Sequence, residues 1–324
     1  MQIPFLRGDN DVPEELNLYA DSLLEDTTNI VTNWQEAVVS NMPAVQSDPV
    51  RKAAHLRVGM VSVDEKPRLP MLLGDATQTD MLQFICLPRN PRIADNELYE
   101  IDGMDYIVVL AGIRKRITKH EARWIQRLKN MGIPMLVILP YEAKQRREQH
   151  QIDAFSQRVG IPFVSLTDED AEVSREQFVS LTLEHMPAMS LALAASAPAF
   201  RSPLLETLMN NATSDSMLVD DPQSVQSELV RQLCAAYGLS ERDVDKNRVA
   251  LDTMVKSTAP VAKSLVRLLP VFNSQRRARL TNAVGTLLVG YATKMHLGEH
   301  APALGKDLLP QIWRLYRASK QSVS

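Results

Sequence analysis

Two clusters of basic side chains are the features of this sequence whose residue types and spacing could bind a charged ligand. One lies within residues 106–158, which carry 11 basic and four acidic residues, and the other is a group of arginines near the C-terminus. The residues singled out are Arg114, Lys115, Arg116, Arg123, Arg127, Arg276, Arg277 and Arg279. Such clusters bind acidic proteins, nucleic acids or anionic membranes, or are the solvated sides of helices. Few aromatic side chains accompany the first cluster, which disfavours a nucleic-acid partner.

The residue patterns of common catalytic and metal centres are missing from the sequence. Residues 120–124 (HEARW) have tryptophan where the second histidine of a zinc-binding HExxH motif would stand. Cys86 and Cys234 lie far apart without a neighbouring cysteine or histidine, which argues against a zinc site or disulfide and favours a reducing, cytoplasmic location. The GxSxG motif of serine hydrolases does not occur. The sequence therefore predicts no catalytic residue, no metal ion and no cofactor.

An acidic helix is predicted near the N-terminus. Residues 12–41 have apolar residues at three-, four- and seven-residue steps, namely Leu16, Tyr19, Leu23, Ile30, Trp34 and Val38. The first 50 residues carry one base and nine acids, whereas residues 261–324 carry ten bases and two acids. Such segments can face one another within one fold or an oligomer, or the basic end can meet an anionic partner.

Strand-like and helical stretches alternate in the middle of the chain. Short apolar runs occur at residues 56–63, 81–87, 105–111, 134–139 and 162–166. Helices are predicted after Thr118, which forms a capping box with Glu121, and at residues 143–158 and 174–186. This alternation is typical of an α/β domain with a mainly parallel sheet and flanking helices.

After residue 186 the strand-like runs end. Residues 187–213 contain three prolines and are expected to form broken helices, and further helices are predicted at 222–238, 242–268, 275–296 and 306–319. The chain is therefore expected to consist of an acidic N-terminal helix and linker (1–53), an α/β domain (54–186) and an all-α C-terminal domain (187–324).

Several segments resemble a family of small-GTPase-like proteins. Residues 105–110, a helix ending at residues 131–134 (MGIP) and the run 135–139 are similar to the second half of a small GTPase domain. Residues 184–201 and 229–239 resemble passages of one GTPase family whose members carry a C-terminal helical domain of unknown function (type 697). The resemblance implies a P-loop-GTPase-like sheet followed by an all-α domain.

The register of this resemblance places the phosphate-binding loop after the run 56–63. A P-loop needs glycines that expose backbone N–H groups, then a lysine and a Ser or Thr that binds magnesium. With Lys66 as the lysine, Met60 and Glu65 take the glycine positions and Pro67 takes the Ser/Thr position. Only the lysine matches, so this P-loop is degenerate.

The other nucleotide motifs implied by the resemblance are also replaced. Residues 87–90 (LPRN) stand where Asp-x-x-Gly would sense magnesium and the γ-phosphate, and residues 139–142 (LPYE) stand where Asn-Lys-x-Asp would read guanine. Ser165 alone fits its position, that of the guanine-loop serine. The sequence thus resembles a degenerate member of the family, a pseudo-GTPase.

The function expected from this resemblance is that of a catalytically inactive GTPase-like protein that acts as a protein-interaction, scaffold or regulatory component. Its partner would be a paralogous active GTPase or another copy of the chain. Two alternatives stay open. One is a peripheral membrane protein that uses the basic C-terminal helices, although residues 280–297, the most apolar stretch, contain Lys294 and are too polar to span a bilayer. The other is an atypical nucleotide-binding GTPase.

Overall fold

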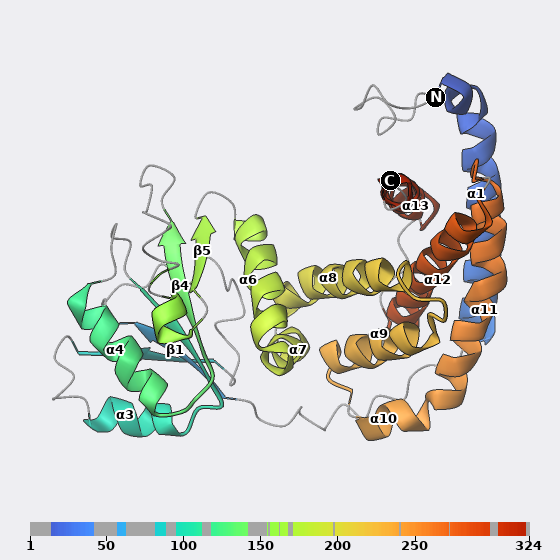
Figure 1. Cartoon of the computed structure of the whole chain (residues 1–324). Coiled ribbons are helices and arrows are strands. Elements are labelled where there is room, and N and C mark those ends of the chain that lie inside the picture. The colour runs from blue at the N-terminus through green and yellow to red at the C-terminus, as the bar shows by residue number, and fades with distance from the viewer. Residues whose placement is uncertain are drawn as a thin grey trace. The chain divides into compact units, whose positions relative to one another are not determined.

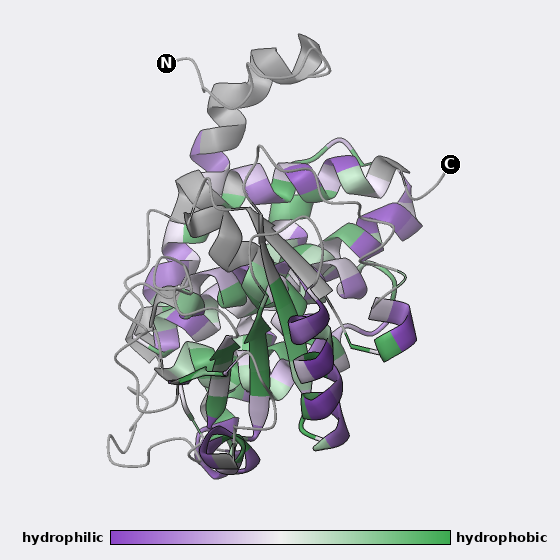
Figure 2. Ribbon diagram, turned by 90° about the vertical axis from the view of Figure 1, so that its left-hand side faces the viewer, coloured by the Kyte–Doolittle hydropathy of each residue, from purple (hydrophilic) through white to green (hydrophobic). Residues whose placement is uncertain are grey.

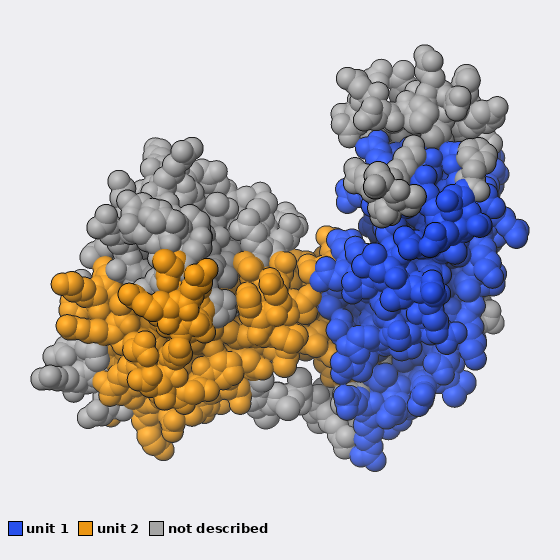
Figure 3. All heavy atoms as spheres, in the orientation of Figure 1, with its two compact units in different colours: residues 1–47, 208–234, 240–324 blue, residues 48–207, 235–239 orange. Residues whose placement is uncertain are grey.

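The computed structural model describes residues 14–41, 57–62, 82–88, 95–111, 118–141, 154, 156–161, 163–167, 171–196, 198–239, 241–271, 273–298 and 304–321. Within these ranges the chain is mostly helical and forms one small parallel sheet. It divides into two compact units, which Figure 3 shows in different colours. The helical unit consists of residues 1–47, 208–234 and 240–324, and the sheet unit of residues 48–207 and 235–239.

The sheet unit is built on five parallel strands in the order β2-β1-β3-β4-β5. The strands are β1 (Val58–Ser62), β2 (Leu82–Cys86), β3 (Tyr106–Leu110), β4 (Met135–Tyr141) and β5 (Phe163–Thr167). Strands β1 and β3 are buried almost throughout, and the described strand residues are mostly hydrophobic in Figure 2. Strands that are apolar on both faces need cover on both sides, as parallel sheets have. The expected parallel sheet with flanking helices, followed by a helical region, is confirmed.

The helices of the sheet unit are α3 (Asp95–Asp102), α4 (Lys119–Asn130), α6 (Ala171–His185), α7 (Pro187–Ser196) and the first part of α8 (Pro198–Ser216). In helix α4, neighbouring residues in the sequence determine where the helix begins and ends. The predicted capping box at the start of α4 is confirmed. The Glu121 amide donates to Thr118 Oγ1 at 3.2 Å, and the Thr118 amide donates to Glu121 Oε2 at 2.6 Å. Gly132, with φ of 78°, follows the helix end in the left-handed conformation that glycine favours.

The helical unit surrounds one buried helix, α12 (Ser274–His296), in which every residue from Ala283 to Thr293 is buried. It also contains α1 (Glu14–Asn41), the rest of α8, most of α9 (Gln223–Ala236), α10 (Glu241–Lys246), α11 (Arg248–Arg267) and α13 (Leu304–Gln321). Helices α11 and α13 pack against α12, and α1 packs against both of them (Figure 1). In the core, Ser216 Oγ lies 2.7 Å from Thr286 Oγ1, to which Gln226 Nε2 donates at 3.2 Å.

The two units differ from the predicted domains at both boundaries. Helix α1 is part of the helical unit, because its buried face, which includes Val31 and Trp34, packs there. The second boundary falls inside α8, after residue 207, and not at residue 186. Helix α7 packs on α6, and Arg201 of α8 donates to the carbonyl oxygens of Ala194 and Ala195 at 3.2 and 3.3 Å. These contacts keep α7 and the start of α8 with the sheet.

Candidate functional site

The carboxyl ends of the strands form the edge where ligands bind in open α/β sheets, at the point where the strand order reverses. In this sheet that point lies between β1 and β3, which end at Ser62 and Leu110. The segments that follow, 63–81 and 112–117, lie outside the described residues. Glu65, Lys66 and Pro67 of the degenerate P-loop fall there, as do the basic residues Arg114, Lys115 and Arg116.

Met60, which the resemblance places at the first glycine position of a P-loop, lies in the middle of strand β1. Its backbone is paired on both sides, opposite Phe84 of β2 and Val108 of β3. Its side chain is 1% exposed and belongs to the core. A loop that cradles phosphate therefore does not begin at this residue, because a strand paired on both sides cannot turn its successive N–H groups toward one ligand.

The end of β2 is fixed to the core of the sheet unit. The Leu87 amide donates to the carbonyl oxygen of Ser62 at 2.7 Å, and the Leu87 side chain is 4% exposed. The indole Nε1 of Trp124 donates to the carbonyl oxygen of Pro88 at 2.8 Å. The positions to which the resemblance assigns the metal-sensing motif thus hold an apolar side chain, Leu87, and an anchored backbone, that of Pro88. Arg89 and Asn90 lie outside the described residues.

The end of β4 continues as a strand where the guanine-reading motif is expected. The backbone of Leu139, Pro140 and Tyr141 pairs with that of residues 165–167 in β5. Strand β4 tolerates Pro140 because its pairing with β3 ends at Ile138. The N–H that proline lacks is therefore not required for a hydrogen bond to β3. Residues 139–141 are thus part of the sheet and do not form a base-reading loop.

Helix α4 presents a basic surface opposite its buried face. Arg123 and Lys119 are exposed, and Arg127 is half-buried with its guanidinium carbon 5.6 Å from the centre of the Trp124 ring. The ammonium group of Lys129 donates to the carbonyl oxygen of Val159 and so ties α4 to the segment before β5. Arg123 and Arg127, two of the predicted interaction residues, therefore lie together on one surface helix.

The arginines before the core of α12 have a different setting. Arg276 donates to Ser319 Oγ at 2.9 Å and to the Tyr316 carbonyl oxygen at 3.2 Å, and its guanidinium lies over the Tyr316 ring. A guanidinium N–H of Arg277 donates to the carbonyl oxygen of Val271. Arg276 and Arg277 thus join the start of α12 to α13 and to the turn before it.

Arg279 lines a shallow cavity of about 260 Å³ in the helical unit. Its other lining residues are Ser214, Met217, Leu218, Asn273, Gln275, Arg276, Ala318 and Ser319. Among the described residues there is no group of three or more His, Cys, Asp and Glu side chains that could hold a metal ion. The cavity therefore offers arginine and hydroxyl groups beside an apolar wall.

The described helices contain no segment long and apolar enough to cross a membrane. Residues 280–297, the stretch considered for membrane contact, form most of α12, whose apolar residues pack inside the helical unit. In the same buried stretch, Thr286 bonds with Ser216 of α8, and Thr293 donates to the carbonyl oxygen of Val289 in its own helix. The apolar character of α12 is thus explained by burial within the protein.

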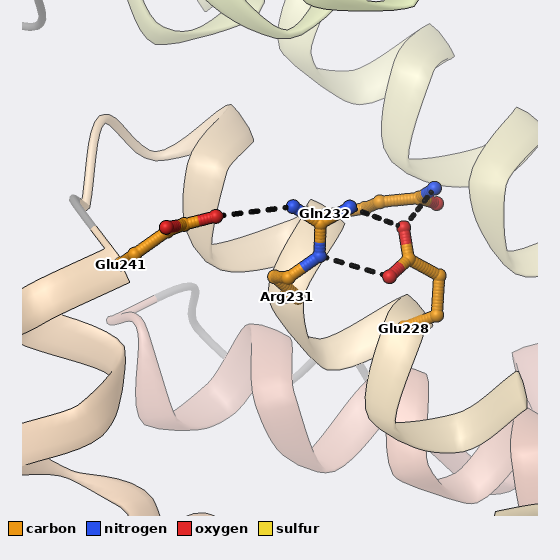
Figure 4. Close-up of polar contacts among 4 residues, drawn as sticks. All are labelled: Glu228, Arg231, Gln232 and Glu241. Atoms are coloured by element: carbon orange, nitrogen blue, oxygen red, sulfur yellow. Dashed lines mark hydrogen bonds and ion pairs between the residues drawn. The ribbon is translucent and has the colours of Figure 1, made fainter. Parts of the chain in front are cut away.

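An ion-pair cluster joins α9 to α10, and sequence analysis did not single it out (Figure 4). Arg231 donates to both carboxylate oxygens of Glu228 at 2.7 and 2.8 Å and lies 3.5 Å from Glu241. The hydrogen bond from Arg231 lowers the pKa of Glu228 below its ordinary value. The i, i+3 spacing of Glu228 and Arg231 is the signal in the sequence that could have revealed this pair.

The two cysteines differ in their surroundings. Cys234 is buried, and burial raises the pKa of its thiol to about 11, so the thiolate is scarce at neutral pH. Cys86 is exposed on the edge strand β2. Both are free thiols, as the sequence predicted.

Comparison of the chain with family models, with curated proteins and with solved structures finds no match.

Proposed function

We propose that the protein is a pseudo-GTPase, a catalytically inactive protein with a P-loop-GTPase-like sheet that acts as an interaction, scaffold or regulatory component. The observation that carries the proposal is the burial of Leu87 at the end of β2. In the register of the small-GTPase resemblance, a carboxylate that senses magnesium would stand at this position. A buried leucine there provides no oxygen for a metal ion.

Two further observations support the loss of the site. Met60 lies inside β1 where a P-loop would need a glycine in a turn, and residues 139–141 extend β4 where a base-reading loop would follow. In active GTPases, switch segments become ordered on the γ-phosphate and are released on hydrolysis. A segment held by Leu87 and by the Trp124–Pro88 hydrogen bond lacks that freedom at its start.

A protein without a nucleotide site would act by binding other molecules through its surface. The exposed surface of α4 is basic, and the one acid of the helix, Glu121, is buried. This surface suits an acidic protein partner, either a paralogous active GTPase or a second copy of this chain. We place the protein in the cytoplasm because its two cysteines are free thiols, which suits a reducing compartment.

Thermal unfolding of the full chain tests this function. A ligand that binds only the native state at 100 times its Kd stabilises that state by about 2.7 kcal/mol. We expect the unfolding temperature in magnesium to be the same without nucleotide, with GTP and with GDP. A rise that saturates with GTP or GDP and requires magnesium would support the atypical nucleotide-binding GTPase instead. An active small GTPase measured in parallel provides the positive control.

A further inference from the structure

Two helices, one in each unit, carry charge of opposite sign. Helix α1 contains six acidic residues and no basic residue. Helix α4 contains four lysines and arginines and a single acid, Glu121. Glu121 is 5% exposed and forms the capping box with Thr118, so it does not neutralise the exposed surface of α4. The two helices therefore differ in the sign of the charge that their sequences carry.

Two acidic residues of α1, Glu25 and Glu36, lie opposite the face that packs in the helical unit. Thr27, Val31, Trp34 and Val38 are buried. At 3.6 residues per turn, Glu25 and Glu36 are about 20° apart around the helix axis and roughly 160–180° from Trp34. Both glutamates are exposed. We call this surface, Glu25 and Glu36 with the neighbouring exposed Asp26, the acidic face.

The basic residues of α4 are arranged in the same way. Trp124, Ile125 and Leu128 are fully buried against the sheet. Lys119 and Arg123, one turn apart and exposed, lie on the opposite side, and Arg127 follows a further turn along. We call these three residues the basic face. Because their spacing repeats every four residues, the positive charges form a stripe along the helix.

Five of the charged residues on the two faces have no ion-pair partner in the described parts of the chain. In the parts of the chain that the structure describes, Lys119 and Arg123 have no acidic partner, and Glu25, Asp26 and Glu36 have no basic one. The ion pairs found there lie elsewhere, between residues of α9 and α10. Exposed charges of opposite sign attract each other over about 10 Å, the Debye length at 0.1 M salt.

We propose that the basic face of one copy binds the acidic face of a second copy, so that the chain self-associates through α4 and α1. This inference rests on the proposed function, because it names the protein partner and the surface it uses. The contact joins two different surfaces, and every copy carries one of each. Trp124 is fully buried, so the basic face offers no aromatic side chain for stacking on nucleic-acid bases.

Sedimentation velocity on the full chain at low and high salt tests the inference. We expect the average mass of the wild type to rise with concentration at low salt and to fall to that of the monomer at high salt. The double variants K119E/R123E and E25K/E36K should each weaken association about tenfold or more, because each then carries two faces of the same sign. A mixture of the two variants should associate again, since it contains complementary faces.

A matched control separates face-specific effects from net charge. The variant R242E/R248E lowers the net charge by the same amount as K119E/R123E does, but at exposed positions on α10 and α11. It should associate as the wild type does. Circular dichroism of each variant checks that it folds; the K119E change puts an acid into the first turn of α4, where acids are favourable. The inference is contradicted by a wild type that stays monomeric, by equal effects of K119E/R123E and R242E/R248E, or by variants whose mixture stays dissociated.

A salt-dependent sedimentation coefficient that does not vary with protein concentration would also contradict the inference, because it would indicate a contact within one chain. Failure of self-association leaves the proposed pseudo-GTPase function standing as long as nucleotide has no effect on thermal unfolding. A nucleotide effect would instead remove the proposed function whatever mass the protein has. The two failures are therefore distinguishable.

Discussion

The indole Nε1 of Trp124 donates a hydrogen bond of 2.8 Å to the carbonyl oxygen of Pro88, which links the buried face of α4 to the end of β2. Trp124 is fully buried, and Leu87, the residue before Pro88, belongs to the same hydrophobic core cluster. The chain therefore leaves the sheet from a fixed point. In the small-GTPase register, a nucleotide-sensing loop that has to move would start at this point.

Replacing Trp124 by phenylalanine should lower the free energy of unfolding by more than the loss of buried aromatic surface explains. The substitution also leaves the partly buried carbonyl oxygen of Pro88 without its hydrogen-bond donor. We expect W124F to lower the free energy of unfolding by about 1–2 kcal/mol more than W313F does. Trp313 is the matched control, because its buried Nε1 has no hydrogen-bond partner among the described residues. Urea unfolding of both variants measures the difference, and equal losses would show that the bond to Pro88 contributes nothing.

Restoring a carboxylate at the end of β2 should not restore a metal site. We expect L87D to destabilise the sheet unit by about 3 kcal/mol or more, because it puts a charge into an apolar core. The variant should also show no magnesium-dependent nucleotide binding. C86D is the control on the same strand, since Cys86 is exposed, and it should change the stability little. Tight magnesium-dependent binding of GTP by L87D would mean that the rest of the site is intact.

The hydroxyl group of Thr286 should stabilise the core of the helical unit. It bonds with Ser216 and accepts a hydrogen bond from Gln226, all three being buried. T286V keeps the shape but leaves these two partners unpaired, so we expect a loss of about 1–3 kcal/mol in urea unfolding. T281V, on the exposed side of the same helix, should lose much less. A T286V protein as stable as T281V would show that water or repacking satisfies the partners.

The stability of the helical unit should depend on pH through His296. Burial lowers the pKa of His296 below its ordinary value of 6.5. The unfolded chain then takes up a proton before the folded one does, so stability is full above pH 6.5 and falls as the pH drops through this value toward the folded pKa. H296L, which cannot titrate, should remove this decline, whereas H120Q at an exposed position should retain it. Parallel stability profiles of H296L and the wild type between about pH 5 and 7.5 would contradict the assignment.

Local signals in the sequence predicted much of the fold. Apolar runs bounded by polar residues predicted β1 and β3 to within about two residues, and the spacing of Thr118 and Glu121 predicted the capping box. Gly132, Gly160 and Gly238 follow helical segments and have positive φ, the conformation that glycine favours at a helix end. These features depend on a few neighbouring residues, which is why a single sequence reveals them.

Long-range contacts limited the rest of the prediction. The prolines of residues 187–213 predicted broken helices, and the structure has separate helices there that begin at Pro187 and Pro198, where a missing N–H costs nothing. The sequence could not show which basic cluster is structural and which is exposed. The hydrogen-bond partners of Arg276 lie 40 and 43 residues further along the chain. Arg123, by contrast, is exposed on its helix. Which arginines are structural thus depends on packing between distant helices.

Isothermal titration of the full chain with GTP and with GDP, each in the presence of magnesium, tests the loss of the nucleotide site most directly. The proposed pseudo-GTPase should give only heats of dilution for both nucleotides, because buried Leu87 and Met60 stand where the small-GTPase resemblance would put parts of the nucleotide site. Saturable binding of either nucleotide with micromolar affinity would contradict the proposal.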